Sequence, residues 1–266
     1  MKLYHGTTER VAQLALQSGL RPRGDTGVES HWEDCPSSDD HVYLTVAYAP
    51  YFAMGATHEE GSGRWAIIEI DTDRLPYGEE WLMPDEDFLE QASRSPEDRQ
   101  RIQELSASQA DWTLPVDAEM VERTRWFREH LHWFSRQWEE SIRRLGNCTH
   151  AGEIPPQAIT RICFVDPTPL NAMCRMALDP MITLLNYRIC ESKYRSLTQW
   201  LFGADVEPKD FGIMTPDQLL GGGEITELDP SFQKHLDLLR GQHTAYHQML
   251  ADRSGIEVIT TQTETP

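Results

Sequence analysis

Apolar and polar residues follow each other along the first part of the chain in a pattern that predicts a sheet with helices between its strands. The opening KLYHG reads as a short strand that stops at Gly6, and Thr7 or Thr8 then caps a helix over ERVAQLALQSG. Further strands are predicted at 41–45, 64–75 and 158–166. A helix at 47–61 follows the second strand and tolerates Pro50 because this residue falls in its first turn.

The clearest helical period lies at 117–145. Its apolar residues recur along one stripe: Val121, Phe127, Leu131, Phe134, Trp138, Ile142 and Leu145. The other faces carry arginines with tryptophans between them: Arg123, Arg125, Arg128, Arg136, Arg143 and Arg144, with Trp126 and Trp133. Such a surface can bind single-stranded nucleic acid by base stacking and phosphate contact. The plain alternative is an amphipathic helix with charge pairs one turn apart.

The remaining segments are loops and a helical C-terminal part. Residues 21–40 are rich in Pro, Gly, Ser and Asp, and a loop of this length is often functional. After residue 166 the chain becomes rich in Met and Leu and predicts helices, the last of them at 231–253. The final residues, TTQTETP, are predicted to be disordered.

The composition is that of a globular protein in water. The 266 residues suit one large or two small domains, with 39% hydrophobic and 25% charged residues. No apolar run is long enough to span a membrane and the start shows no signal peptide, so a cytoplasmic location is expected. Five dispersed cysteines without a Cys-x-x-Cys pair indicate reduced thiols. His31 and Cys35 have no second pair to complete a zinc site, so no metal is expected.

Two polar residues stand at positions where chemistry is plausible. His5 ends the first strand beside a glycine, where a backbone can approach a ligand closely, although a lone histidine is more often a satisfied core residue. Glu153 lies between a glycine and an isoleucine, just before two prolines and the strand at 158–166. Taken alone, it reads as a solvated residue at a strand edge.

Motifs around these residues, taken in order, resemble the ADP-ribosyltransferase superfamily. They are Tyr4-His5-Gly6-Thr7, Gly19-Leu20, Val42-Tyr43-Leu44-Thr45 and Ile154-Pro155-Pro156. The resemblance is to the His-Tyr-Glu branch, which includes the diphtheria-toxin-like and poly(ADP-ribose) polymerase enzymes, and equally to the related RNA 2′-phosphotransferases. It covers about residues 2–166.

This resemblance implies an enzyme that cleaves NAD and passes ADP-ribose to an acceptor. Glu153 would bind a hydroxyl of the nicotinamide ribose and stabilise the ribosyl cation. His5 would bind a ribose hydroxyl of the adenosine half, and the backbone of Gly6, next to Thr7, would hold the nicotinamide amide. Other carboxylates close in sequence remain alternatives to Glu153: Glu119, Glu122, Glu139 and Glu140.

The resemblance also assigns the groups that would orient NAD. Tyr43 would stack on the nicotinamide ring, and either Tyr48 or Tyr51 would cover the other side of it. Arg21 and Arg23 are candidates for the NAD phosphates, because a guanidinium pairs well with phosphate oxygens; otherwise they are solvated loop charges.

The choice among related activities depends on departures from the family patterns. RNA 2′-phosphotransferases carry a histidine where this chain has Tyr43 and typically have a winged-helix domain before the first motif, so ADP-ribosyl transfer is favoured. The acceptor is expected to be RNA or single-stranded DNA, as in toxin–antitoxin and phage-defence effectors, with an antitoxin protein as a possible partner. The net charge of −19 weighs toward a protein acceptor. An inactive binding module on this fold and a purely structural scaffold remain alternatives.

The expected fold is α+β. A split-sheet core of the ADP-ribosyltransferase type spans 1–166, with a helical insertion at about 84–146 and a helical C-terminal extension at 167–266.

Overall fold

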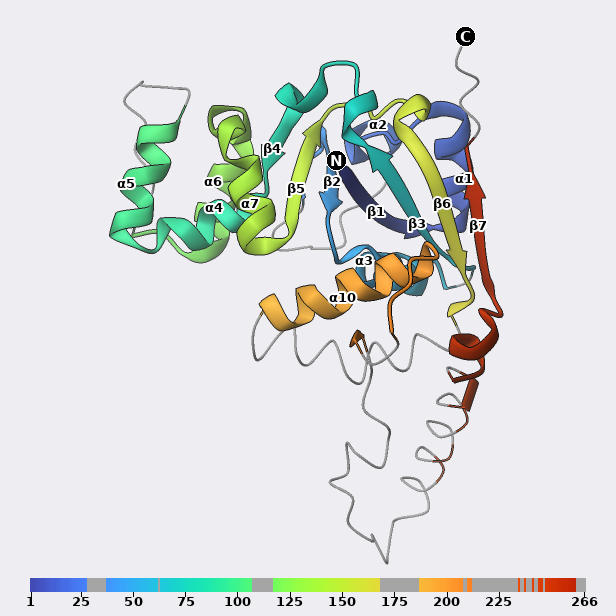
Figure 1. Cartoon of the computed structure of the whole chain (residues 1–266). Helices are drawn as coiled ribbons and strands as arrows, with labels where there is room; N and C mark the ends of the chain where they lie inside the picture. Colours follow the sequence, from blue (N-terminus) through green and yellow to red (C-terminus); the bar gives the residue numbers. More distant parts are fainter. Residues whose placement is uncertain are drawn as a thin grey trace, which may run out of the picture.

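The computed structural model describes residues 1–27, 37–61, 63–106, 117–167, 187–207, 210–211 and 247–261, with isolated positions between 234 and 245. Seven strands form one antiparallel sheet in the order β4-β5-β2-β1-β3-β6-β7 (Figure 1). The strands are β1 (Lys2–Thr8), β2 (His41–Thr45), β3 (Trp65–Asp71), β4 (Leu82–Pro84), β5 (Asn147–Ala151), β6 (Ile159–Val165) and β7 (Ile256–Thr260). The expected mixed α and β class is confirmed.

The helices α1 (Glu9–Ser18) and α3 (Ala49–Glu60) follow the predicted starts and stops closely. The short helix α2 (Arg23–Thr26) was not predicted and lies within the segment 21–40 that was expected to be a loop. The Thr8 side chain accepts a hydrogen bond from the Val11 backbone N–H, so Thr8 is the N-cap of α1. Pro50 lies in the first turn of α3, as predicted, and the predicted strands at 41–45, 64–75 and 158–166 appear as β2, β3 and β6.

Gly6 allows α3 to lie directly on β1. A Cβ atom at Gly6 would stand 1.9 Å from the Ala49 carbonyl oxygen and 2.7 Å from the Ala53 nitrogen. Only a residue without a side chain fits such a close approach of helix backbone to strand backbone. β1 also continues to Thr8 instead of stopping at Gly6.

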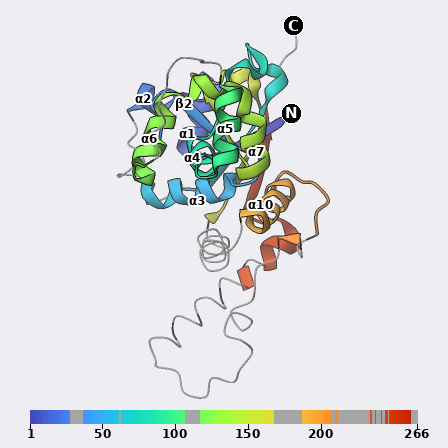
Figure 2. The ribbon, with the colours of Figure 1, turned by 90° about the vertical axis from the view of Figure 1, so that its left-hand side faces the viewer.

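The helical insertion lies beside β4 and β5, with a small core of its own. It consists of α4 (Glu86–Ser93), α5 (Pro96–Leu105), α6 (Met120–Glu129), the 3₁₀ segment η3 (Leu131–Gln137) and α7 (Trp138–Leu145). Figure 2 shows these helices together on the side of the sheet that faces the viewer. Phe88, Leu89, Phe127, Leu131 and Phe134 form the centre of this core and are all nearly inaccessible to solvent.

The single helix predicted at 117–145 is wrong, because the segment divides into α6, η3 and α7, with breaks at His130 and Gln137. α6 packs against α4, whereas η3 packs against β4. The apolar residues of this segment therefore pack on two different elements, α4 and β4, and the segment is not one continuous helix. His130 leaves the helical conformation (φ −124°, ψ 17°) at the first of these breaks.

The C-terminal part joins the same sheet. α10 (Tyr187–Leu201) packs against α3, and the Thr198 hydroxyl donates a hydrogen bond of 3.0 Å to the Ala47 carbonyl oxygen. β7 pairs with β6 along its whole length. The expected helical extension thus also supplies an edge strand, and Thr260, assigned to a disordered tail, is part of it. Two short 3₁₀ segments, η1 (Thr72–Arg74) and η2 (Gly78–Trp81), connect β3 to β4, and η4 (Pro156–Ala158) precedes β6.

No helix within the described residues is long and apolar enough to cross a membrane.

Candidate active site

The sheet opens between β1 and β2. The two strands pair at one position only, Tyr4 opposite Thr45, whereas β1 pairs with β3 along its whole length. His5, Gly6 and Thr7 lie beyond that single pair. The strand edges that separate there leave backbone groups facing the opening, and unpaired edges of this kind can bind a ligand.

His5 bridges this opening. Its Nδ1 lies 2.9 Å from the carbonyl oxygen of Tyr43. Because a carbonyl oxygen can only accept, Nδ1 carries the proton and Nε2 of the neutral ring is an acceptor. Burial lowers the pKa of His5 below its ordinary value of 6.5, with the bond to Tyr43 opposing the effect. The imidazole is therefore neutral at pH 7, with one acceptor nitrogen available for a hydroxyl group.

Tyr43 is fixed at its phenol end. Its hydroxyl donates a hydrogen bond of 2.5 Å to Glu86 Oε1 on α4 and accepts one of 2.8 Å from the Ser38 backbone N–H. Burial and the nearby carboxylates of Glu86 and Asp85 raise the pKa of Tyr43 well above 10, so it is a neutral donor. The ring remains half-buried. The two hydrogen bonds fix the direction of the ring axis, and the partly exposed ring can stack on a planar ligand.

Glu86 is a buried carboxyl group that the sequence analysis did not single out. Burial raises its pKa from 4.5 to about 7, although the bond from Tyr43 acts in the opposite direction. Its second oxygen, Oε2, is buried and has no hydrogen-bond partner among the described residues. Glu86 is 43 positions from Tyr43 in the chain, and no local pattern connects the two.

Arg23 lies at a hollow beside Tyr43. This hollow of about 260 Å³ is lined by Arg23, Ser37, Ser38, Asp39, Asp40, Arg128 and Glu129. Arg23 donates a hydrogen bond of 2.7 Å to the Ser37 carbonyl oxygen and forms an ion pair with Asp39, while its buried Nε has no partner among the described residues. The two arginines could hold a diphosphate there, but the phosphate would have to replace Asp39 as the partner of Arg23.

Glu153 lies at the same end of the sheet and is exposed. The Gly152 N–H donates a hydrogen bond of 2.8 Å to the carbonyl oxygen of Asp40, which also lines the hollow. Leu20 and Ile154 exchange two backbone hydrogen bonds of 2.8 Å as an antiparallel bridge. That bridge places exposed Arg21 opposite Glu153. Segment 37–41 thus connects the surroundings of Tyr43, Arg23 and Glu153.

The structure does not bring Tyr48 and Tyr51 to these residues through any described contact. Tyr48 is buried, and its ring lies 5.6 Å from that of Tyr194 on α10. Tyr51 also contacts Tyr194, at 6.2 Å. Thr7 is buried. The face of Gly6 where a side chain would stand is covered by α3. The expected second tyrosine of a nicotinamide stack therefore packs under α10 in this structure.

The arginines at 117–145 are largely engaged within the insertion. Arg123 pairs with buried Glu90, Arg143 with Glu140, and Arg144 with Asp98 and Glu140. Trp126 stacks on His130 and contacts Trp133. Three arginines of the predicted stacking surface are thus engaged in ion pairs of the insertion, whereas Arg125 and Arg136 are exposed.

An aromatic pair on η2 was missed by the sequence analysis. Tyr77 and Trp81 are stacked with ring centres 4.3 Å apart, and both are exposed. Their spacing of four in an acidic, proline-marked segment gave no periodic signal.

The chemistry of the site is that of oxygen, imidazole and guanidinium groups. Within the described part of the chain, no group of three or more His, Cys, Asp or Glu residues could hold a metal ion. His31 and Cys35, considered above for zinc, lie outside the described residues. Comparison with protein-family models and with curated proteins gave no match for the chain.

Proposed function

We propose that this protein is an NAD-dependent ADP-ribosyltransferase of the His-Tyr-Glu type that acts on nucleic acid. The observation that carries the proposal is the opening between β1 and β2, across which His5 is bonded to Tyr43. Together with the motif order, it supports a split-sheet core of the ADP-ribosyltransferase type. NAD would lie in the opening, with its diphosphate toward Arg23.

The reaction would be a glycosyl transfer. The bond between the nicotinamide nitrogen and ribose C1′ breaks, and nicotinamide leaves with the electron pair. The acceptor atom then forms a bond to C1′ and releases its proton to solvent. Glu153 would stabilise the positive charge that develops on the ribose, and neutral His5 would accept a hydrogen bond from a ribose hydroxyl through Nε2. Tyr43 would fix the nicotinamide ring by stacking.

The test uses NAD labelled on its adenylate half, mixed in separate reactions with RNA, single-stranded DNA and a protein extract. Label on RNA or DNA supports the proposal, and Glu153→Gln should lower the rate by about a hundredfold or more. Glu97→Gln, the same change at an exposed residue of α5, should have no effect. Label on protein alone would change the acceptor and keep the reaction. If nothing is labelled and no nicotinamide is released, the proposal is wrong.

A role as a bacterial toxin or phage-defence effector, restrained by an antitoxin, goes with this activity. Expression in a bacterial host should arrest growth, whereas Glu153→Gln at the same protein level should not. Equal arrest by both forms would exclude transfer as the cause.

A further inference from the structure

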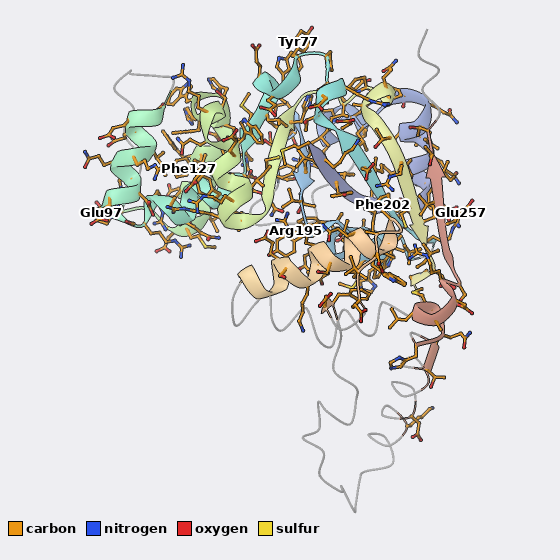
Figure 3. All side chains as sticks on the ribbon, in the orientation of Figure 1. Tyr77, Glu97, Phe127, Arg195, Phe202 and Glu257 are labelled. Atoms are coloured by element: carbon orange, nitrogen blue, oxygen red, sulfur yellow. The ribbon has the colours of Figure 1, made fainter. Side chains whose placement is uncertain are left out.

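Tyr77 and Trp81 form a flat aromatic surface, called here the aromatic ledge. The ring centres are 4.3 Å apart and the planes differ by 15°, so the rings are nearly parallel. Tyr77 is 55% and Trp81 37% exposed. Large exposed side chains that stack face to face present a planar surface to solvent, and stacking on such a surface is open to any planar group. Figure 3 shows Tyr77 at the rim of the molecule, far from the insertion core around Phe127.

The ledge adjoins Glu153. Leu82, the first residue of β4, pairs with His150 of antiparallel β5. Trp81 precedes Leu82 and therefore lies beside the residues that follow His150, toward Gly152. A Cβ atom at Gly152 would lie 3.3 Å from the Trp81 ring, which means that the indole packs on the glycine backbone. The His150 ring, 5.9 Å from Trp81, supports it from the sheet. The indole is therefore fixed beside the residue that precedes Glu153.

The charges around the ledge have a mixed arrangement. Glu79 and Glu80 are exposed on η2, between the two rings in sequence. Arg21 is exposed opposite Glu153. Glu79 and Glu80 thus place carboxylates, which can accept hydrogen bonds from N–H groups, in the same turn as the two rings, and Arg21 adds a cation near the candidate reaction centre. The positive charge of Arg21 repels a positively charged acceptor beside Glu153 and attracts an acceptor that carries a phosphate.

We propose that the aromatic ledge binds one unstacked nucleobase of the acceptor strand, and that Glu79 and Glu80 favour bases with an exocyclic amino group. This inference rests on the proposed transferase function and names its substrate class. Adenine, cytosine and guanine carry amino donors, whereas uracil and thymine do not. Because Arg21 is the cation that the bridge to Ile154 places near the ledge, few phosphates would be neutralised and binding should depend weakly on salt.

Binding is measured first, by fluorescence anisotropy of labelled single-stranded oligonucleotides of adenine and of uracil. The adenine strand should bind more tightly, and Tyr77→Ala should weaken its binding by about tenfold or more, because a stacked base contributes roughly that much. Tyr77→Phe keeps the ring and should restore binding. Phe52→Ala, at an exposed aromatic residue of α3, is the matched control and should change nothing. Equal binding by Tyr77→Ala and the unaltered protein would overturn the proposal, as would equal affinity for adenine and uracil strands.

Two readouts separate this proposal from the transferase proposal. Nicotinamide release to water needs NAD alone, whereas label on the oligonucleotide also needs the acceptor base. Tyr77→Ala should retain release and lose transfer by about tenfold. A parallel loss of both would show that the ledge does not act on the acceptor, and transfer to an arginine-containing peptide instead of the oligonucleotide would exclude a base as its occupant. Absence of both nicotinamide release and label with the unaltered protein would refute the transferase proposal, while the anisotropy result would still decide whether the ledge binds bases.

Discussion

The buried pair of Glu86 and Tyr43 should make the stability of the protein fall as pH rises from about 4.5 to about 7. Burial raises the pKa of Glu86 from its ordinary 4.5 to about 7. Below this range the carboxyl group is protonated in both the folded and the unfolded chain. Within it, the unfolded chain releases a proton that the folded protein retains, so each step up in pH favours unfolding. Above it, both states are ionised and this contribution stays constant.

The size of the effect follows from the change in proton affinity. A pKa difference of one corresponds to about 1.4 kcal/mol. The rise from 4.5 to about 7 therefore corresponds to about 3 kcal/mol of unfolding free energy. This is a large share of the total for a protein whose stability lies in the ordinary range of about 5–15 kcal/mol.

The substitution Glu86→Gln should remove this pH dependence. Glutamine is neutral at every pH and keeps an oxygen that can accept the Tyr43 hydroxyl. The cost of burying its amide is the same at each pH, so the slope is the informative quantity. Burial also raises the pKa values of Asp85 and Asp87, which are present in both forms. Because the charge of Glu86 adds to the rise at Asp85, Glu86→Gln also removes that part of the Asp85 contribution, which has the same sign.

The measurement is urea unfolding of both forms at several pH values between about 4.5 and 8. The free energy of Glu86→Gln minus that of the unaltered protein should rise by about 3 kcal/mol over this interval and then remain level. Glu97→Gln, at an exposed position, should give a constant difference within about 0.5 kcal/mol. Parallel curves for Glu86→Gln and the unaltered protein would show that this carboxyl group is not buried in solution, and the reasoning would fail.

Other substitutions test the core and the opening. Gly6→Ala should destabilise the protein by about 1–3 kcal/mol in thermal unfolding, because its methyl group would overlap the Ala49 carbonyl; an unchanged melting temperature would contradict this close packing. Burial lowers the pKa of His5, so below pH 6.5 the unfolded chain binds more protons than the folded protein and acid lowers the free energy of unfolding. His5→Gln should reduce this loss of stability in acid. The same decrease in both forms would refute the reasoning. Arg161→Leu leaves the buried Glu69 carboxylate without its main partner and should cost about 3–5 kcal/mol in urea unfolding, against a much smaller effect of removing an exposed pair.

Much of the fold was predictable from local patterns. The strands β2, β3 and β6 and the helices α1 and α3 each have a period, a cap or a proline position within their own residues. The hydrogen bonds and side-chain faces that define such elements join residues close in sequence, so the sequence alone carries the signal. The strands that contain His5 and Tyr43 were each predicted, but only the structure shows that they are neighbours, through the bond between the two residues.

Other elements were fixed by their neighbours. β5 (NCTHA) has little apolar character of its own, yet Cys148, Thr149 and His150 are buried because β2 and β4 flank it. The β-branched run IEVIT of β7 favours a strand, and the edge of β6 decides where that strand pairs. The helix expected at 117–145 divides because its apolar stripe packs on both α4 and β4.

By itself, the sequence determined the local elements that hold His5 and Tyr43, and it marked both residues and Glu153 as candidates for the chemistry. Only the tertiary structure decided what those residues meet. It bonded Tyr43 to Glu86, placed Arg21 opposite Glu153, turned Tyr48 toward α10 and set the aromatic ledge beside Gly152. The reason is physical: burial and pairing between residues far apart in the chain depend on how the sheet and helices pack, and no local pattern of residue types encodes those distances.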